Sequence, residues 1–172
     1  TATYQGDGNF AGSSDTEAHH VGQAGTGTTI TGDSPDPSGV GQAVAVSYAV
    51  APVSPGSGTP TGNVTVSDGT TSCTGTVAAG SCNITLNTIG TRTLVAQYAG
   101  DADFAGSTSP TVQHQVSIIA TSTSITGHTP NPSTVGQGIT VSYTVAAPLG
   151  TPTGTVTVTD GTDTCSASVV AG

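Results

Sequence analysis

The sequence predicts an all-β fold made of tandem antiparallel β-sandwiches, with about seven strands in each repeat. Three observations carry this prediction. Threonine and glycine account for 34 and 25 of the 172 residues, and such a composition favours pleated strands separated by turns. Apolar residues alternate with polar ones along most of the chain, with the period of two that is typical of strands. The chain also repeats itself at an offset of 94 to 95 residues, a normal size for a small sandwich.

The internal repeat divides the chain into three parts. Residues 59–86 read TPTGNVTVSDGTTSCTGTVAAGSCNITL and recur in large part over 151–172, while 4–13 match 98–107. We expect the C-terminal part of one repeat (1–25), a complete repeat (26–119) and the N-terminal part of the next (120–172). Each incomplete part is expected to be completed either by further chain, as a window on a longer repetitive protein, or by strands of a neighbouring molecule.

The complete repeat is predicted to contain about seven strands. The first begins near Thr28 and meets Pro35 and Pro37, which force a kink and lack N–H donors. This suits a strand that breaks as it crosses between sheets. Residues 44–50 alternate apolar and small side chains, as expected for a central strand. Period two continues at about 63–67, 73–77, 82–86, 92–98 and 112–118. Short turns without any helical pattern indicate a two-sheet antiparallel sandwich.

The three cysteines predict one disulfide inside the complete repeat. Cys73 and Cys82 bracket a turn at Ala79-Gly80, and cysteines that flank a hairpin turn can come close enough to bond. Closing this loop would stabilise the fold by about 2.5 to 3 kcal/mol in the chain-entropy model. The bond would place the protein in an oxidising compartment. Cys165 aligns with Cys73, and its partner is expected just beyond Gly172.

The charge balance excludes several kinds of partner. Ten acidic residues stand against one basic residue, Arg92, for a formal net charge of -9. We therefore expect no nucleic-acid partner and no binding to anionic lipid. No apolar stretch is long enough for insertion into a membrane. The sequence also lacks a Gly-x-Ser-x-Gly motif and any Cys/His zinc pattern, so we expect no enzyme.

A few residues are candidates for ion binding or modification. Asp101 and Asp103 could offer carboxylate oxygens to calcium, the one cofactor kept open, but a turn capped by Asp101 is the favoured interpretation. No metal site is predicted. His19 and His114 occupy equivalent places in two repeats and are interpreted as ordinary polar strand residues. Asn63 and Asn83 begin glycosylation sequons and are candidates for that modification, although both lie in predicted strands.

Several motifs resemble the bacterial Ig-like domain repeats of large exported cell-surface and adhesin proteins. They are Pro35-x-Pro37-Ser38 with Val40-Gly41-Gln42, Gly58-Thr59-Pro60-Thr61-Gly62 with Val64, Val66 and Asp68-Gly69, the cysteine pair, and Tyr98-x-Gly100-Asp101-x-x-Phe104. The resemblance implies immunoglobulin-like sandwiches at an extracellular or cell-surface location. It also implies that the partners are neighbouring repeats and other copies in a fibre. It transfers no catalytic residue and identifies no ligand.

Two functions are compatible with this resemblance. The leading hypothesis is a structural repeat that forms the shaft of an extracellular bacterial fibre, stalk or adhesin. The alternative is a carbohydrate- or protein-binding Ig-like adhesion module, which usually presents aromatic anchors. The chain has only four Tyr and two Phe, of which Tyr48, Tyr98, Tyr143 and Phe104 are predicted to lie in cores. This scarcity of free aromatic residues favours the shaft.

The joints between repeats are predicted to differ in stiffness. Residues 116–121 are β-prone and contain neither proline nor glycine, so a flexible linker is not expected there. The corresponding earlier joint, 22–27, is glycine-rich and is expected to be looser. We expect nearly coaxial repeats that are spaced about 35 to 45 Å apart along the axis.

Overall fold

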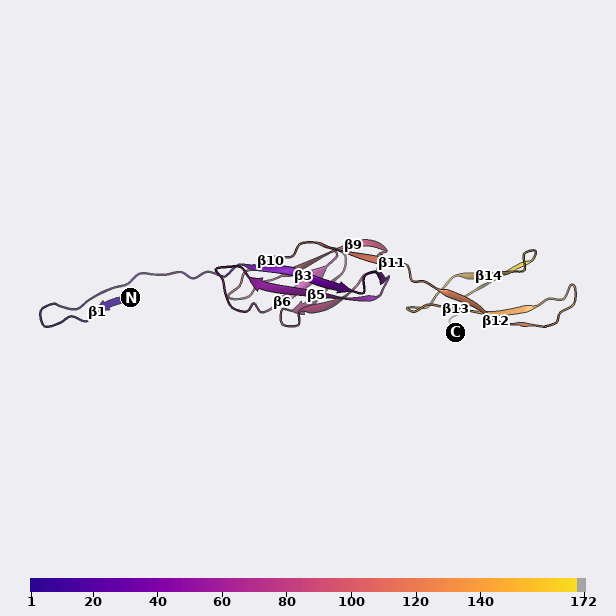
Figure 1. Ribbon diagram of the computed structural model, residues 1–172, viewed down its shortest axis with the longest axis horizontal. Helices are drawn as coiled ribbons and strands as arrows, with labels where there is room; N and C mark the ends of the chain where they lie inside the picture. The colour runs from indigo at the N-terminus through magenta and orange to yellow at the C-terminus, as the bar shows by residue number, and fades with distance from the viewer. Residues whose placement is uncertain (170–172) are drawn as a thin grey trace.

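The computed structural model describes residues 1–169, and every regular element within them is a β-strand. Figure 1 shows three bodies along the longest axis of the molecule: an N-terminal hairpin, a complete β-sandwich and a pair of C-terminal ribbons. The described residues contain no helix that is long and apolar enough to cross a membrane. The prediction of an all-β fold is confirmed.

The complete sandwich consists of two packed sheets. The smaller sheet has the strand order β3-β5-β8, with β3 at Thr26–Ser34, β5 at Ala43–Pro52 and β8 at Ser81–Thr85. The larger sheet has the order β4-β11-β9-β6-β7, with β4 at Ser38–Gly39, β11 at Val112–Ser117, β9 at Gly90–Tyr98, β6 at Asn63–Ser67 and β7 at Ser72–Thr76. The two-residue strand β10 (Ser107–Thr108) pairs with the end of β9.

The first strand crosses between the sheets, as predicted. β3 pairs with β5 in the smaller sheet, and β4 then pairs in parallel with β11 in the larger one. Pro35 and Pro37 lie in the interval between β3 and β4. Because proline has no N–H group to give to a ladder, the chain leaves one sheet at this point and joins the other. The crossing places the start of the domain beside its last strand.

The core lies between the two sheets and follows the predicted period of two. In the central strand β5, Val44, Val46 and Tyr48 are buried and the residues between them are exposed. In β9, Leu94, Ala96 and Tyr98 are buried, again on alternate positions. The remaining buried apolar residues are Val64, Val66, Ile84, Leu86, Phe104 and Val116. Alternation is sufficient to build this core because each strand buries one face and leaves the other to solvent.

The flanking segments form two-stranded ribbons. β1 (Ala2–Tyr4) pairs with β2 (Ser13–Asp15), β12 (Ser122–Thr129) with β13 (Thr140–Ala146), and β14 (Thr155–Thr159) with β15 (Thr164–Ser168). Their registers repeat those of the sandwich. Tyr4 pairs with Ser13 as Tyr98 pairs with Ser107, and the irregularity inside β12 stands where β3 has its own. The internal repeat of the sequence is thus also a repeat of local structure.

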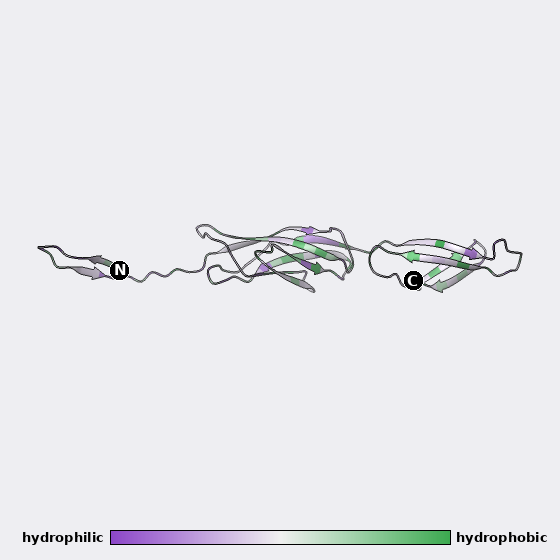
Figure 2. Cartoon of the chain, turned by 90° about the horizontal axis from the view of Figure 1, so that it is seen from below, coloured by the Kyte–Doolittle hydropathy of each residue, from purple (hydrophilic) through white to green (hydrophobic). Residues whose placement is uncertain are grey.

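The ribbons expose side chains whose counterparts are buried in the sandwich. Phe10 is 67% exposed, whereas the matching Phe104 is 6% exposed. Ile125 in β12 is exposed, whereas its counterpart Ile30 is partly buried against the core. Figure 2 shows apolar residues in green on the strands of the C-terminal ribbons as well as on those of the sandwich. The ribbons therefore carry the apolar pattern of a sandwich, but the apolar faces of the C-terminal ribbons are at most half-buried.

Candidate functional site

The Cys73–Cys82 disulfide joins the two sheets of the sandwich. The sulfur atoms are bonded and the Cα atoms lie 5.9 Å apart. β7, which carries Cys73, pairs with β6 in the larger sheet, while β8, which carries Cys82, pairs with β5 in the smaller one. The prediction of a hairpin is wrong, because a turn flanked by alternating residues looks the same whether it closes a hairpin or changes sheet. Cys165 is exposed and unpaired among the described residues.

The turn after β6 is closed by the carboxylate of Asp68. Its Oδ1 accepts hydrogen bonds from the N–H groups of Thr70 and Thr71, at 2.9 and 2.7 Å, and its Oδ2 lies 2.8 Å from Arg92 Nη2. Burial acts to raise the pKa of Asp68, but the bonds from Thr71, Thr70 and Arg92 outweigh it and hold that pKa well below its usual range. The one basic side chain of the sequence is therefore committed to this turn.

A second aspartate turn fixes the loop that precedes β6. Asp101 Oδ2 accepts bonds from the hydroxyl and the N–H of Thr61, at 2.7 and 2.8 Å, and Oδ1 accepts from the N–H groups of Asp103 and Phe104. The Thr61 hydroxyl and N–H are the main groups that lower the pKa of Asp101. Both oxygens face hydrogen-bond donors, which is the arrangement of a turn cap. Calcium binding at Asp101 and Asp103 stays an untested alternative to this interpretation.

A polar cluster lies where the kinked first strand meets the last strand. His114 of β11 is fully buried. Its Nε2 lies 2.8 Å from Ser38 Oγ, and its Nδ1 lies 2.6 Å from Asp33 Oδ2 and 3.7 Å from Asp36 Oδ1. Asp36 Oδ1 also accepts a hydrogen bond of 2.9 Å from the N–H of Gln115. Three short segments, the end of β3, the kink and β4, thereby converge on one imidazole.

The interpretation of His114 as an ordinary polar strand residue missed this cluster. Asp33 lies 81 residues away in the sequence, so no local motif connects the two. The one signal that could have found the cluster is the two-proline kink at Pro35 and Pro37. A first strand that crosses to the other sheet must run beside some other strand there, and the last strand of the domain is a natural neighbour.

The order of atoms in this cluster is that of a serine-hydrolase triad, from the Ser38 hydroxyl through His114 to the Asp33 carboxylate. Ser38 is 1% exposed, however, and it pairs through β4 with β11. A substrate carbonyl cannot reach a hydroxyl that is covered in this way. The hydrogen bonds therefore tie the start of the domain to its end and give Ser38 no nucleophilic role.

Comparison with known protein families agrees with this sandwich. A family model described as Bacterial Ig-like domain (group 3) matches residues 30–117, which is half of the chain. The chain belongs to this family. No curated protein and no solved structure matches it. Bacterial Ig-like domains commonly occur in surface or exported proteins, so the chain is a surface module of some kind.

The surface of this bacterial Ig-like domain carries no aromatic side chain. Tyr48, Tyr98 and Phe104 are the three aromatic residues between residues 26 and 117, and all three are buried. Asn63 and Asn83 are exposed on β6 and β8, where an attached sugar would meet no steric obstacle from the core. Their glycosylation stays a prediction.

The segment before the Ig-like domain is held more firmly than its glycines suggest. The N–H of Ala24 donates to Asp103 O at 2.8 Å, and the carbonyl of Ala24 accepts from the N–H of Ala105 at 2.9 Å. The Gln23 side chain donates to Asp101 O at 2.7 Å. The expectation of a loose joint over 22–27 is therefore wrong from Gln23 onward, because the extended backbone pairs with the 101–105 loop.

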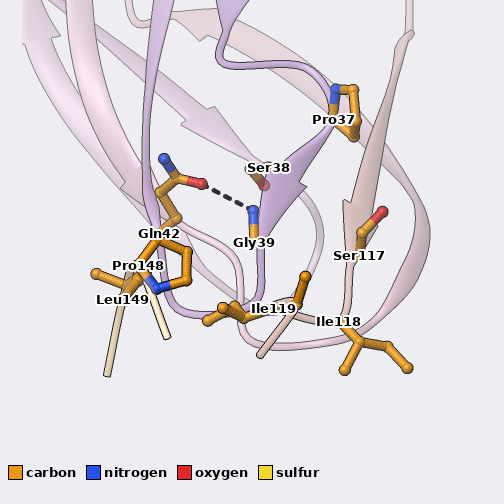
Figure 3. Close-up of a pocket in the computed structure, with 10 residues that line it drawn as sticks. Pro37, Ser38, Gly39, Gln42, Ser117, Ile118, Ile119, Pro148 and Leu149 are labelled. Carbon is orange, nitrogen blue, oxygen red and sulfur yellow. Dashed lines mark hydrogen bonds between the residues drawn. The ribbon is translucent and has the colours of Figure 1, made fainter. Parts of the chain in front are cut away.

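The segment after the Ig-like domain is also packed. Ile119 lies against Gly39, with its Cγ1 only 3.0 Å from the place a Cβ of residue 39 would take. Figure 3 shows Pro148 and Leu149, from the loop after β13, beside Gln42 at this end of the domain, while Ile118 points away. A shallow pocket thus forms where the C-terminal ribbons meet the sandwich.

Proposed function

We propose that the chain is a stretch of tandem Ig-like repeats that forms the shaft of an extracellular bacterial fibre, stalk or adhesin. Membership of the bacterial Ig-like domain family supports a surface location. The observation that carries the proposal is the joint between β11 and β12, which consists of residues 118–121 alone. A joint this short, with Ile119 packed on the preceding domain, transmits both orientation and load along the chain.

The internal repeat supports contacts on the far side of the same joint. At the offset of 95 residues, 118–121 correspond to 23–26. In the complete domain that segment is bonded through Gln23 and Ala24 to the 101–105 loop. The equivalent loop of a following repeat would hold 118–121 in the same way. Each joint would then be packed against the domain before it and hydrogen-bonded to the domain after it.

The C-terminal ribbons reproduce details of the complete domain that a chance resemblance would not. The Tyr48 hydroxyl donates to the carbonyl of Thr76 at 3.1 Å, and the Tyr143 hydroxyl donates to that of Ser168 at 3.1 Å. Asp160 closes its turn by accepting from the N–H groups that follow it, as Asp68 does. We infer that these ribbons are the front of another Ig-like sandwich whose exposed faces are covered by further strands.

The proposal is tested by the shape of the chain in solution and by its binding behaviour. We expect small-angle scattering and electron microscopy to show an elongated particle with about 35 to 45 Å of axial length per repeat. Beads that hinge freely about the 118–121 joint would contradict a shaft. Arrays of glycans and host surface proteins provide the second measurement. Specific binding through loops of the 26–117 domain would favour the adhesion module instead.

A further inference from the structure

We propose that Asp33, Asp36 and His114 bind a divalent transition-metal ion of the zinc type. One ligand atom from each residue can be chosen so that all three lie within 4.8 Å of one another. The residues come from the end of β3, from the kink and from β11. An ion held by all three would therefore fasten the first strand of the Ig-like domain to its last strand.

The donor set suits zinc better than calcium or magnesium. Zinc accepts imidazole nitrogen and carboxylate oxygen in one site, whereas calcium and magnesium favour sites built from oxygen alone. Ser38 Oγ lies 2.8 Å from His114 Nε2, and in the tautomer whose Nε2–H donates a hydrogen bond to Ser38 the Nδ1 lone pair faces the two carboxylates and is free to bind the ion. Orientation of a ligating histidine through its second nitrogen is a regular feature of metal sites. The Asp36 side chain is 39% exposed, so the site has an open side for entry and for a water ligand.

The cluster carries negative charge that a bound cation would balance. Asp33 and Asp36 bring two carboxylates together, and the Asp33 side chain is only 11% exposed. Arg92, the single Lys or Arg of the sequence, is already paired with Asp68. A divalent ion held between Asp33 and Asp36 would neutralise both carboxylates. Charge removed from solvent is costly unless it is paired, so this balance favours a cation at the site.

The cluster needs only small movements to take the ion. Zinc bonds of about 2.0 to 2.2 Å place neighbouring ligand atoms of a tetrahedral site about 3.3 Å apart. His114 Nδ1 now lies 2.6 Å from Asp33 Oδ2 and 3.7 Å from Asp36 Oδ1. The first separation must open by about 0.7 Å and the second must close by about 0.4 Å. The closing movement falls on Asp36, which lies in a partly exposed kink between β3 and β4, and the opening movement falls on Asp33 near the end of β3.

The next repeat keeps donor atoms at the same places. His128 pairs with Val141 in β12 and β13 as Asp33 pairs with Val46 in β3 and β5. At the same offset of 95, Asn131 stands at the place of Asp36. Replacing a carboxylate by an imidazole removes the negative partner that a histidine ion pair would need. It retains a ligand for a transition metal at the position of Asp33.

The test uses the full chain, zinc chloride and isothermal titration calorimetry. We expect saturable binding that Asp36→Asn weakens at least about tenfold and that Ser38→Ala weakens about 10- to 100-fold. Asp36→Asn keeps an acceptor for the Gln115 N–H, so this variant decides the question even where His114→Gln unfolds the domain. Asp15→Asn, which changes an exposed carboxylate of β2 outside the cluster, is the matched control and should bind as the parent does.

Nitrogen chemical shifts of the histidine rings identify the ligand directly. We expect zinc to shift Nδ1 of His114 and to leave the exposed His19 and His20 rings unchanged. A chain without saturable zinc binding would overturn the proposal. So would binding that Asp36→Asn leaves intact, or binding that disappears with His19→Asn and His20→Asn. Because the readout is metal binding to one domain, its failure would leave the shaft proposal standing, and a hinged shaft would leave the metal site standing.

Discussion

At the scale of single residues, three aspartates use their carboxylates to cap turns. Asp68, Asp101 and Asp160 each accept hydrogen bonds from backbone N–H groups two and three residues ahead of them or in a neighbouring loop. The N–H groups of Asp163 and Thr162 lower the pKa of Asp160 to about 2. In a sequence without lysine, these turns replace salt bridges as the main use of carboxylate charge.

Among these three aspartates, Asp68 is expected to contribute most to the free energy of unfolding. We expect Asp68→Asn to lower the free energy of unfolding by about 1 to 3 kcal/mol at pH 7, because it weakens the bonds of a nearly covered carboxylate and leaves Arg92 without its partner. The folded pKa of Asp68 lies below its unfolded value near 3.9, so the contribution of Asp68 is complete above the unfolded value and is lost progressively as pH falls from there through the folded pKa. Urea unfolding curves between pH 7 and pH 3 measure both effects.

The same series contains its own control. Asp103→Asn removes an exposed charge from another turn and should leave the free energy of unfolding nearly unchanged. The gap between the parent chain and Asp68→Asn should narrow below about pH 4, where Asp68 of the unfolded parent chain begins to take up a proton while the folded carboxylate stays ionised. A gap that widens with acid would contradict the assigned role of Asp68.

At the scale of elements, the crossing from β7 to β8 holds the two sheets together at one edge. The chain changes sheet between these strands, and the Cys73–Cys82 bond joins them across the core. The opposite crossing, from β3 to β4, is secured by the bonds of His114 to Asp33 and Ser38. A disulfide therefore stabilises one of these two crossings, and the hydrogen bonds of His114 stabilise the other.

The contribution of the disulfide to the free energy of unfolding can be measured by removing the bond. We expect the double variant Cys73→Ser, Cys82→Ser to be less stable by about 2.5 to 3 kcal/mol, the chain entropy released when a loop of this size is opened. Urea unfolding of the oxidised chain and of the variant gives the difference. Cys165→Ser is the control, because Cys165 is exposed and unpaired in the described part of the chain. Thiol labelling of the oxidised parent should find one reactive cysteine, and three reactive cysteines would contradict the bond.

At the scale of the whole molecule, the bodies follow one another along a single axis (Figure 1). The joint after β11 decides whether this arrangement persists in solution. Ile119 packs against Gly39, whereas its neighbour Ile118 is 78% exposed. The two isoleucines therefore separate the effect of packing from the effect of backbone freedom.

We expect Ile119→Gly to loosen the joint and Ile118→Gly to change it little. Both variants add the same backbone freedom, but only the first removes a side chain that touches the preceding domain. Small-angle scattering should show a shorter mean particle and a broader distance distribution for Ile119→Gly. Equal behaviour of the two variants would show that packing at Ile119 does not set the direction of the chain.

Local features of the sequence were enough to predict the strands of this protein. Period two marked the buried faces of β5 and β9, and the prolines at 35 and 37 marked the crossing of the first strand. These signals are local because a strand alternates its own side chains and a proline removes its own N–H group. The internal repeat matched residues 4–13 to 98–107, and the structure pairs the strands of these two segments in the same register.

The tertiary structure alone decided which strands became neighbours. It placed β7 and β8 in opposite sheets, which made the disulfide a bond between sheets, and it brought Asp33 and Asp36 to a buried His114. It also held Gln23 and Ala24 against the 101–105 loop despite their glycine neighbours. In each case the partners lie far apart in sequence or the same local pattern allows two pairings. Alternation therefore specifies the face that each strand buries, and only the packed sandwich specifies what lies against it.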